Sequence, residues 1–168
     1  MSLNQKGGSF MQIKQIISGG QTGADMGGLL AGEFLGIPTG GFAAAGFRTE
    51  LGNKPELGTR FNLEDTRVYN YLHRTALNVH RSDGTALFGN CHEGGTLRTR
   101  QFCVKYKKPH FLVVDYERIN YFRTWILVTN VQVLNVAGNR ESVFPGLEQI
   151  VFRSLVEALK EWNDVDRG

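Results

Sequence analysis

The chain has 168 residues, of which 41% are hydrophobic and 21% charged, and a formal net charge of +3 with a pI near 9.0. The length predicts one domain, and the composition is that of a soluble globular protein. No run approaches the roughly 18 apolar residues that span a bilayer, so we do not expect membrane insertion. The arginines are scattered rather than gathered in one run, so the mildly basic charge does not indicate non-specific nucleic-acid binding.

The N-terminal part of the chain predicts a strand, a helix and a second strand. We expect residues 1–10 to be disordered or derived from an expression tag, and residues 11–165 to form one ligand-binding domain. The apolar run 12–18 predicts a strand, and 26–36 predicts a helix that Gly36 and Pro38 end. A short strand is expected at 39–42.

The middle of the chain begins with a long segment, 43–66, that has no clear periodicity. Glycine, proline and charge dominate it, and such a length is more usual for a binding loop or a lid than for an inert connection. Helical periodicity returns at 69–79, with Tyr69, Leu72, Ala76 and Val79 on one face.

Strands and helices continue to alternate in the rest of the chain. The predicted strands are 85–88, 110–114 and 132–136, and the middle one is apolar enough for burial on both faces. Helices are predicted at 96–106 and 146–162, the latter with apolar positions at Ile150, Leu155, Val156 and Leu159. The aromatic and β-branched residues at 120–128 fit either a helix or a strand, but their place between two strands favours a crossover helix. The alternation predicts an α/β fold of three layers around a mainly parallel sheet of about five or more strands.

Three polar, glycine-rich turns each follow a predicted strand, at 18–25, 89–96 and 138–142. Ligands of open parallel sheets sit outside the carboxyl ends of the strands, so turns after different strands can form one site. Free N–H groups at helix starts and nearby arginines, including Arg48 and Arg60, favour an anion. The expected ligand-binding residues are Gly19, Gly20, Gln21, Thr22, Gly23, Asp25, Arg74, Gly94, Gly95, Thr96, Asn135 and Arg140.

Several motifs resemble, in order, those of the putative molybdenum-cofactor carrier family. They are SGGQTGAD at 18–25, GIP at 36–38, GGF at 40–42, RT at 74–75, NV at 78–79, SDGT at 82–85, GGT at 94–96, KP at 108–109, LNVAG at 134–138 and RES at 140–142. The resemblance implies a Rossmann-like fold, a homo-oligomer, and binding of a phosphorylated pterin cofactor, the molybdenum cofactor among the candidates, or a related nucleotide. One departure is Asn139, where the family often has proline, and we expect it to loosen the third turn.

The pattern is more distantly similar to the lysine-decarboxylase-like nucleotide phosphoribohydrolases. In that resemblance Arg74 takes the place of a catalytic arginine, but the catalytic glutamate position is Thr99. A threonine cannot supply the carboxylate that cleavage of an N-glycosidic bond needs. Glu93 and Asp25 are the carboxylates that could replace it, which leaves Arg74 and Glu93 as the candidate catalytic residues. We therefore expect ligand binding without the hydrolase activity, and the N-glycosidase remains the alternative.

Each candidate residue also has a structural interpretation. Asp25 fits the positive end of a helix as well as it fits a ribose hydroxyl or a cation, and Arg74 could be salt-bridged. Arg48 and Glu50 suit a surface pair or a lid. No metal is expected, because three consecutive side chains at 91–93 cannot easily converge on one ion. The two cysteines form no CxxC pair and give no disulfide framework, so we expect the protein to lie in the reducing cytoplasm.

Two further function classes remain open. A DNA-processing family belongs to the same superfamily, and a nucleic-acid binder would lose affinity steeply with salt. A nucleotide sensor, read by a partner through segment 43–66, is the other. The sequence favours a phosphorylated small molecule over nucleic acid.

Overall fold

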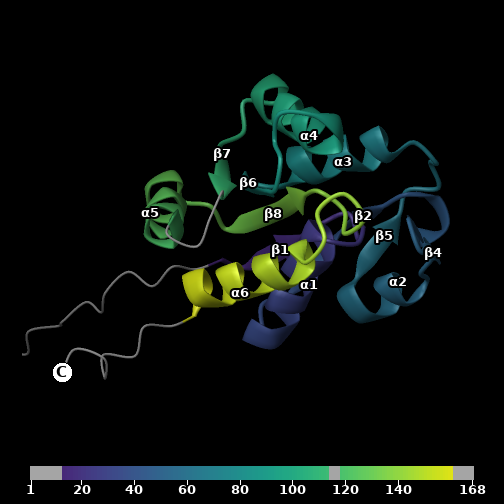
Figure 1. Ribbon diagram of the computed structural model, residues 1–168, viewed down its shortest axis with the longest axis horizontal. Helices are drawn as coiled ribbons and strands as arrows, with labels where there is room; N and C mark the ends of the chain where they lie inside the picture. The colour runs from purple at the N-terminus through teal and green to yellow at the C-terminus, as the bar shows by residue number, and fades with distance from the viewer. Residues whose placement is uncertain (1–12, 114–117, 161–168) are drawn as a thin grey trace, which may run out of the picture.

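A six-stranded parallel sheet forms the centre of the protein. The computed structural model describes residues 13–113 and 118–160 (Figure 1). The strand order is β5-β2-β1-β8-β6-β7, and every neighbouring pair is parallel. The predicted α/β class with a mainly parallel sheet is thus confirmed. The strands are β1 (Gln15–Ile17), β2 (Thr39–Ala43), β5 (Leu63–Asp65), β6 (Gly84–Phe88), β7 (His110–Val113) and β8 (Val133–Gly138).

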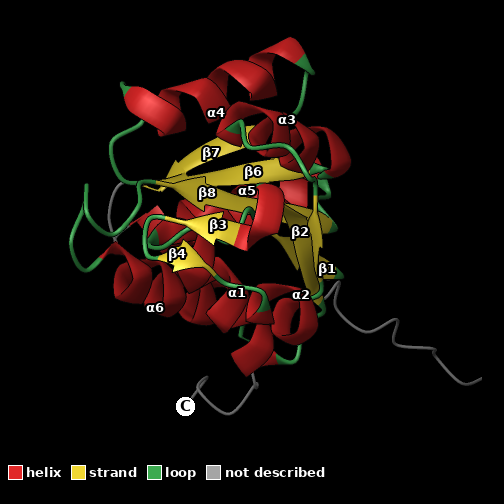
Figure 2. Ribbon diagram, turned by 90° about the vertical axis from the view of Figure 1, so that its right-hand side faces the viewer, coloured by secondary structure: helices red, strands yellow, loops and turns green. Residues whose placement is uncertain are grey.

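Helices cover both faces of the sheet, so the fold has three layers with the sheet in the middle. Figure 2 shows α3 (Tyr71–Arg81) and α4 (Gly94–Lys105) on one face and α1 (Ala24–Leu35) and α6 (Leu147–Leu159) on the other. The ambiguous segment near 120–128 is helix α5 (Ile119–Thr129), which packs against β7 and α6. Gly36 ends α1 in the left-handed conformation, as a C-terminal glycine does. No described helix combines the length and apolarity needed to cross a membrane.

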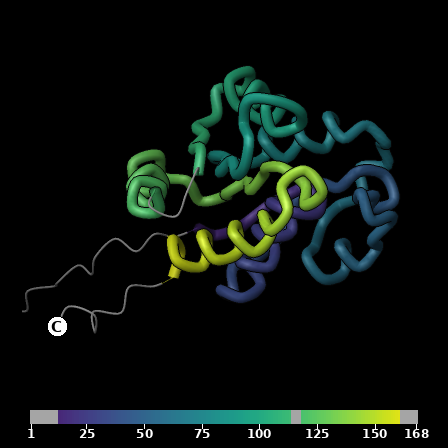
Figure 3. The backbone as a smooth tube through the Cα atoms, in the orientation of Figure 1, coloured from purple at the N-terminus to yellow at the C-terminus, as the bar shows by residue number. Residues whose placement is uncertain are grey.

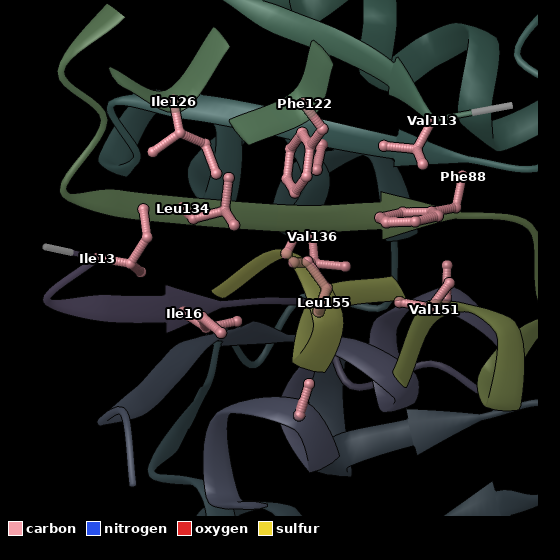
Figure 4. Close-up of a cluster of buried hydrophobic side chains, with 14 of the residues drawn as sticks. Ile13, Ile16, Phe88, Val113, Phe122, Ile126, Leu134, Val136, Val151 and Leu155 are labelled. Atoms are coloured by element: carbon pink, nitrogen blue, oxygen red, sulfur yellow. The ribbon is translucent and has the colours of Figure 1, made fainter. Parts of the chain in front are cut away.

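The main core lies between the sheet and the layer of α1, α5 and α6. Figure 4 shows Val136 of β8 between Phe122 of α5 and the α6 residues Val151 and Leu155, and all four are fully buried. Helix α1 comes very close to β8 at Gly28, which has no side chain. A Cβ at this position would lie only 2.7 Å from the Cβ of Val136. This close approach offsets the roughly 1 kcal/mol that a glycine costs inside a helix.

Segment 43–66 is not the irregular loop that its composition predicts. It contains the 3-10 turn η1 (Ala45–Phe47), the antiparallel hairpin of β3 (Arg48–Thr49) and β4 (Gly52–Asn53), helix α2 (Glu56–Phe61) and the edge strand β5. Leu57, Phe61 and Leu63 bury their side chains in a second apolar cluster with Leu29 of α1. Burial of three apolar residues therefore orders the segment, although no one element in it is long enough to show a period.

Some predicted burial is wrong. Strand β7 lies at the edge of the sheet, so most of it is only half-buried rather than covered on both faces. On the predicted apolar faces, Tyr69 is 71% exposed, Leu72 40% and Ile150 47%. Tyr69 precedes α3, and the buried side chains of that helix are Asn78 and Val79. Parts of the predictions lie outside the described ranges: residues 1–10 of the expected N-terminus, residues 11–12, 114–117 and 161–165 of the expected domain, and with them one end of each predicted element 12–18, 110–114 and 146–162.

Candidate functional site

The three glycine-rich turns meet at one edge of the sheet. They follow β1, β6 and β8, and the parallel strands bring their carboxyl ends together. In Figure 3 the light-green loop after β8 lies between the teal loop before α4 and the purple end of β1. Backbone hydrogen bonds connect all three, because the Asn139 N–H donates to Phe88 O at 3.3 Å and the Ala24 N–H donates to Asn139 O at 3.1 Å.

Asn139 connects the turns. Its side-chain Oδ1 accepts a hydrogen bond from the Asn90 N–H at 2.6 Å. A Cβ on Gly89 would lie 2.2 Å from the same oxygen, so the second turn approaches the third closely. The side chain and backbone of Asn139 thus attach the third turn to the first two, and the expected loosening relative to proline stays a prediction.

A pocket of about 370 Å³ opens where the turns meet, between α3 and α4. Of the residues expected to bind ligand, seven line it: Gln21, Asp25, Arg74, Gly94, Gly95, Thr96 and Arg140. Gly19, Gly20, Thr22, Gly23 and Asn135 are not among the lining residues. The candidate Glu93 also lines it, with Tyr71, Leu72, Thr75, Thr99, Ala137, Gly138, Asn139 and Val143 completing the wall.

The start of α4 presents unused hydrogen-bond donors to this pocket. None of the hydrogen bonds found among residues 13–113 and 118–160 uses the N–H groups of Gly94, Gly95 or Thr96. The Thr96 Oγ1 atom is buried and also has no partner in these residues. A Cβ on Gly95 would meet no atom within 4 Å, so the backbone there faces open space. Such a helix start suits an anion.

The first glycine turn is filled by the protein itself. A Cβ on Gly23 would lie 2.4 Å from Asn139 O, and one on Gly20 would lie 2.8 Å from a Leu63 methyl carbon. The Thr22 hydroxyl donates to Glu50 and accepts from the Glu141 N–H at 3.1 Å. The glycines of this turn thus allow close packing of neighbouring segments, and the open backbone of the site is at α4.

Asp25 and Arg74 form a buried ion pair in the wall of the pocket. Arg74 Nη1 lies 3.1 Å from Asp25 Oδ2, and the two side chains are 12% and 4% exposed. Burial raises the pKa of Asp25 above its ordinary value, while the Arg74 guanidinium and the Gln21 N–H act in the opposite direction. Asp25 also stands in the first turn of α1, so the helix-start interpretation of Asp25 and the salt-bridge interpretation of Arg74 both apply.

The other predicted polar residues have separate positions. Asn135 is buried in β8, where its Nδ2 donates to Thr85 Oγ1 at 3.2 Å. Arg140 is exposed at the pocket wall, and Glu93 accepts a hydrogen bond from Asn90 Nδ2 at 2.7 Å. Arg60 forms an exposed pair with Glu33 at 2.7 Å and does not line this pocket.

The β3–β4 hairpin is attached to both sides of the site. Arg48 lies over the ring of Tyr71 at 4.7 Å and donates to Tyr69 O at 2.9 Å. Glu50 accepts hydrogen bonds from Thr22 and Ser142, one in the first turn and one after β8. Burial alone would raise the pKa of Glu50, but these hydrogen bonds lower it below its ordinary value.

Catalytic and metal-binding groups are few in this pocket. Thr99 is buried, and its hydroxyl donates to Gly95 O at 3.0 Å. The carboxylates that line the wall are Asp25 and Glu93. In the part of the chain that the structure describes, no three His, Cys, Asp or Glu side chains are placed to hold a metal ion.

Sequence reasoning missed Tyr71, Asn139 and Val143 as lining residues. Tyr71 begins α3 and lies beside both Arg48 and Arg74. Asn139 and Val143 flank the recognised Arg140, so the loop after β8 contributes more than its charged residue. The position of Asn139 directly after a strand was the available signal.

Comparisons with known proteins find relatives over most of the chain. A family model described as the circularly permutated YpsA SLOG family matches residues 16–159. A crystal structure of a protein named "Putative molybdenum carrier protein", from Syntrophus aciditrophicus, is 33% identical with a TM-score of 0.81. The match covers 89% of this chain and 96% of that chain. No curated protein matches.

Proposed function

Because the chain belongs to the circularly permutated YpsA SLOG family, we propose that it binds and carries one small phosphorylated ligand, nucleotide-like or pterin-like. The ligand occupies the pocket between α3 and α4. The name of the similar structure, a putative molybdenum carrier, supports a carrier role and makes the molybdenum cofactor a candidate cargo.

Thr96 provides the observation that carries this proposal. Its buried Oγ1 lacks a hydrogen-bond partner in the described residues, and it lies beside the unused N–H groups of Gly94 and Gly95. A buried hydroxyl left without a partner costs about 1–3 kcal/mol. A phosphoryl group would satisfy the hydroxyl and the amides together, and the positive end of the α4 dipole favours its charge.

The size and charge of the pocket agree with this class of ligand. A volume of about 370 Å³ is near the lower end for small-molecule sites, which suits a single nucleotide-sized or pterin-sized molecule. Arg140 adds positive charge to the wall, Arg74 adds N–H donors although its charge is paired with Asp25, and Tyr71 adds an aromatic surface. A terminal phosphate of the molybdenum cofactor fits the donors at 94–96, so the residues present are compatible with that cargo.

Hydrolysis of the ligand is not part of the proposal. Thr99 stands where the related phosphoribohydrolases have a glutamate, and its hydroxyl is already bonded to Gly95 O. Glu93 could serve as a base only from a different backbone position, and Asp25 is paired with Arg74. We expect no release of base from a nucleoside monophosphate. Release at a rate that Glu93→Ala abolishes would favour the N-glycosidase instead.

Two measurements test the binding function. Native mass spectrometry of freshly purified protein should detect a co-purifying small anion. In amide NMR spectra, inorganic phosphate should shift the resonances of Gly94, Gly95 and Thr96, and Thr96→Val should weaken this response about tenfold. Thr124→Val, on the exposed surface of α5, is the matched control. Absence of both a bound anion and phosphate-dependent shifts would refute the proposal.

A further inference from the structure

Asp25 places a negative charge in the wall of a pocket proposed to hold an anion. Its side chain is 4% exposed and lines the pocket together with the amides at the start of α4. A buried carboxylate is costly to desolvate and would repel a phosphoryl group unless another charge cancelled it. The position therefore needs an explanation beyond a favourable helix start.

Arg74, the ion-pair partner of Asp25, is held on several sides. Arg74 Nη1 donates to Asp25 Oδ2 at 3.1 Å, and the guanidinium lies directly over the backbone of Gly19. The ring of Tyr71 lies 5.8 Å from the guanidinium carbon. Arg74 Nε is buried without a hydrogen-bond partner in residues 13–113 and 118–160. One side of the guanidinium is thus fixed, and the side chain still has unused N–H donors.

We infer that Asp25 is a positioning residue for Arg74. Its carboxylate holds Nη1 so that the remaining N–H groups of the guanidinium address an acceptor oxygen of the bound anion. The same contact cancels the charge of Asp25 inside the pocket. This inference rests on the proposed function, and it assigns the ligand a second anionic or acceptor group besides the one at Thr96.

If the Asp25–Arg74 pair only joined α1 to α3, the ligand affinities of the variants would follow a different pattern. In that case removing the charge of Asp25 affects ligand affinity in the same direction whether or not Arg74 is present. If Asp25 acts through Arg74, its effect changes sign. With Arg74 in place, the carboxylate improves binding; without Arg74, it is an unpaired negative charge that opposes binding.

The test is a double-mutant cycle with inorganic phosphate as the probe at pH 8, followed through the amide resonance of Gly95. Asp25→Asn should weaken phosphate binding about tenfold in the wild-type chain. In the Arg74→Gln chain, Asp25→Asn should instead strengthen it severalfold. Glu33→Gln removes the same charge from an exposed ion pair outside the pocket and should change affinity less than about twofold.

The outcomes separate the two proposals. Effects of one sign in both backgrounds, with wild-type binding intact, would overturn the positioning role and leave the proposed function standing. A wild-type chain that does not bind phosphate would overturn both. If Asp25→Asn fails to fold, Gly19→Ala displaces the guanidinium and leaves the carboxylate unpaired. It should weaken binding by at least about tenfold, and unchanged affinity would refute the inference.

Discussion

The guanidinium of Arg74 occupies the place where a side chain at Gly19 would begin. A Cβ on Gly19 would lie 1.8 Å from Arg74 Nη1 and 2.3 Å from the guanidinium carbon. Gly19 therefore allows an arginine from α3 to reach Asp25 across the first turn. The sequence suggests that a ligand phosphate lies beside Gly19. In this structure the guanidinium of Arg74 occupies that space.

Gly19→Ala should destabilise the protein, because the arginine must move and leave Asp25 without its partner. The expected loss is about 1–3 kcal/mol in the free energy of unfolding, the usual cost of an unpaired buried polar group. Urea unfolding measures it. Gly95→Ala is the control, since its Cβ meets nothing within 4 Å, and it should change stability by less than about 0.5 kcal/mol. Equal losses in the two variants would contradict this explanation.

Gly95→Leu should leave the fold intact and remove ligand binding. Gly95 lines the pocket and a Cβ there would meet no atom within 4 Å, so we expect a leucine side chain to extend into the volume assigned to the anion. We expect phosphate affinity to fall by at least about tenfold, measured by amide NMR. Gln101→Leu, on the exposed face of the same helix, should bind like the wild type. Retained affinity in Gly95→Leu would exclude the start of α4 from the site.

Glu50→Gln should reduce stability at neutral pH and have less effect in acid. The pKa of Glu50 is lowered in the folded protein, so its carboxylate stabilises the fold above the ordinary value of 4.5. That contribution disappears as the pH falls through the lower folded pKa. Because Glu50 is only half-buried, the loss at pH 7 should be below about 1 kcal/mol.

Urea unfolding of the wild type and of Glu50→Gln at pH 7 and pH 3 measures this difference. Ser142→Ala removes a hydrogen-bond donor to the same carboxylate. Its free energy of unfolding should therefore also depend less on pH than that of the wild type. A stability difference that is the same at both pH values would show that the charge of Glu50 is not what attaches the hairpin.

Phe61→Ala should destabilise the protein by about 3–5 kcal/mol, the range for large-to-small aromatic changes in a core. Phe61 is 1% exposed and packs with Leu57, Leu63 and Leu29 in the second apolar cluster. Phe34→Ala is the matched control, because Phe34 is 68% exposed, and it should cost less than about 1 kcal/mol. Thermal unfolding compares the two, and a similar loss in both would mean that segment 43–66 does not depend on this cluster.

Local signals in the sequence predict most of the fold. Glycine and proline end α1 where they are expected to, and the alternation of apolar runs with helical periods gives the parallel sheet. Helix α5 follows from its place between two strands. The prediction fails for α2 and β5, because each is too short to show a period and both depend on burial against Leu29 of α1.

The site is harder to predict, because its contacts join residues that are distant in sequence. Asp25 and Arg74 are 49 residues apart, as are Asn90 and Asn139. The glycine turns indicate where the backbone bends but not which bends are filled by the protein. The difference between the filled first turn and the open start of α4 arises from packing, so residue type alone could not separate them.

Strand β8 is the last of the described strands to be synthesised, yet it lies in the middle of the sheet, paired with β1 on one side and β6 on the other. Until it emerges from the ribosome, β5-β2-β1 and β6-β7 have no strand between them to hydrogen-bond. Before β8 is made, these two groups of strands can pair only among themselves, and Asn139 cannot yet join the turns around the pocket. The pocket between α3 and α4 can therefore form only after β8 has been made, when the two groups of strands close around their shared strand.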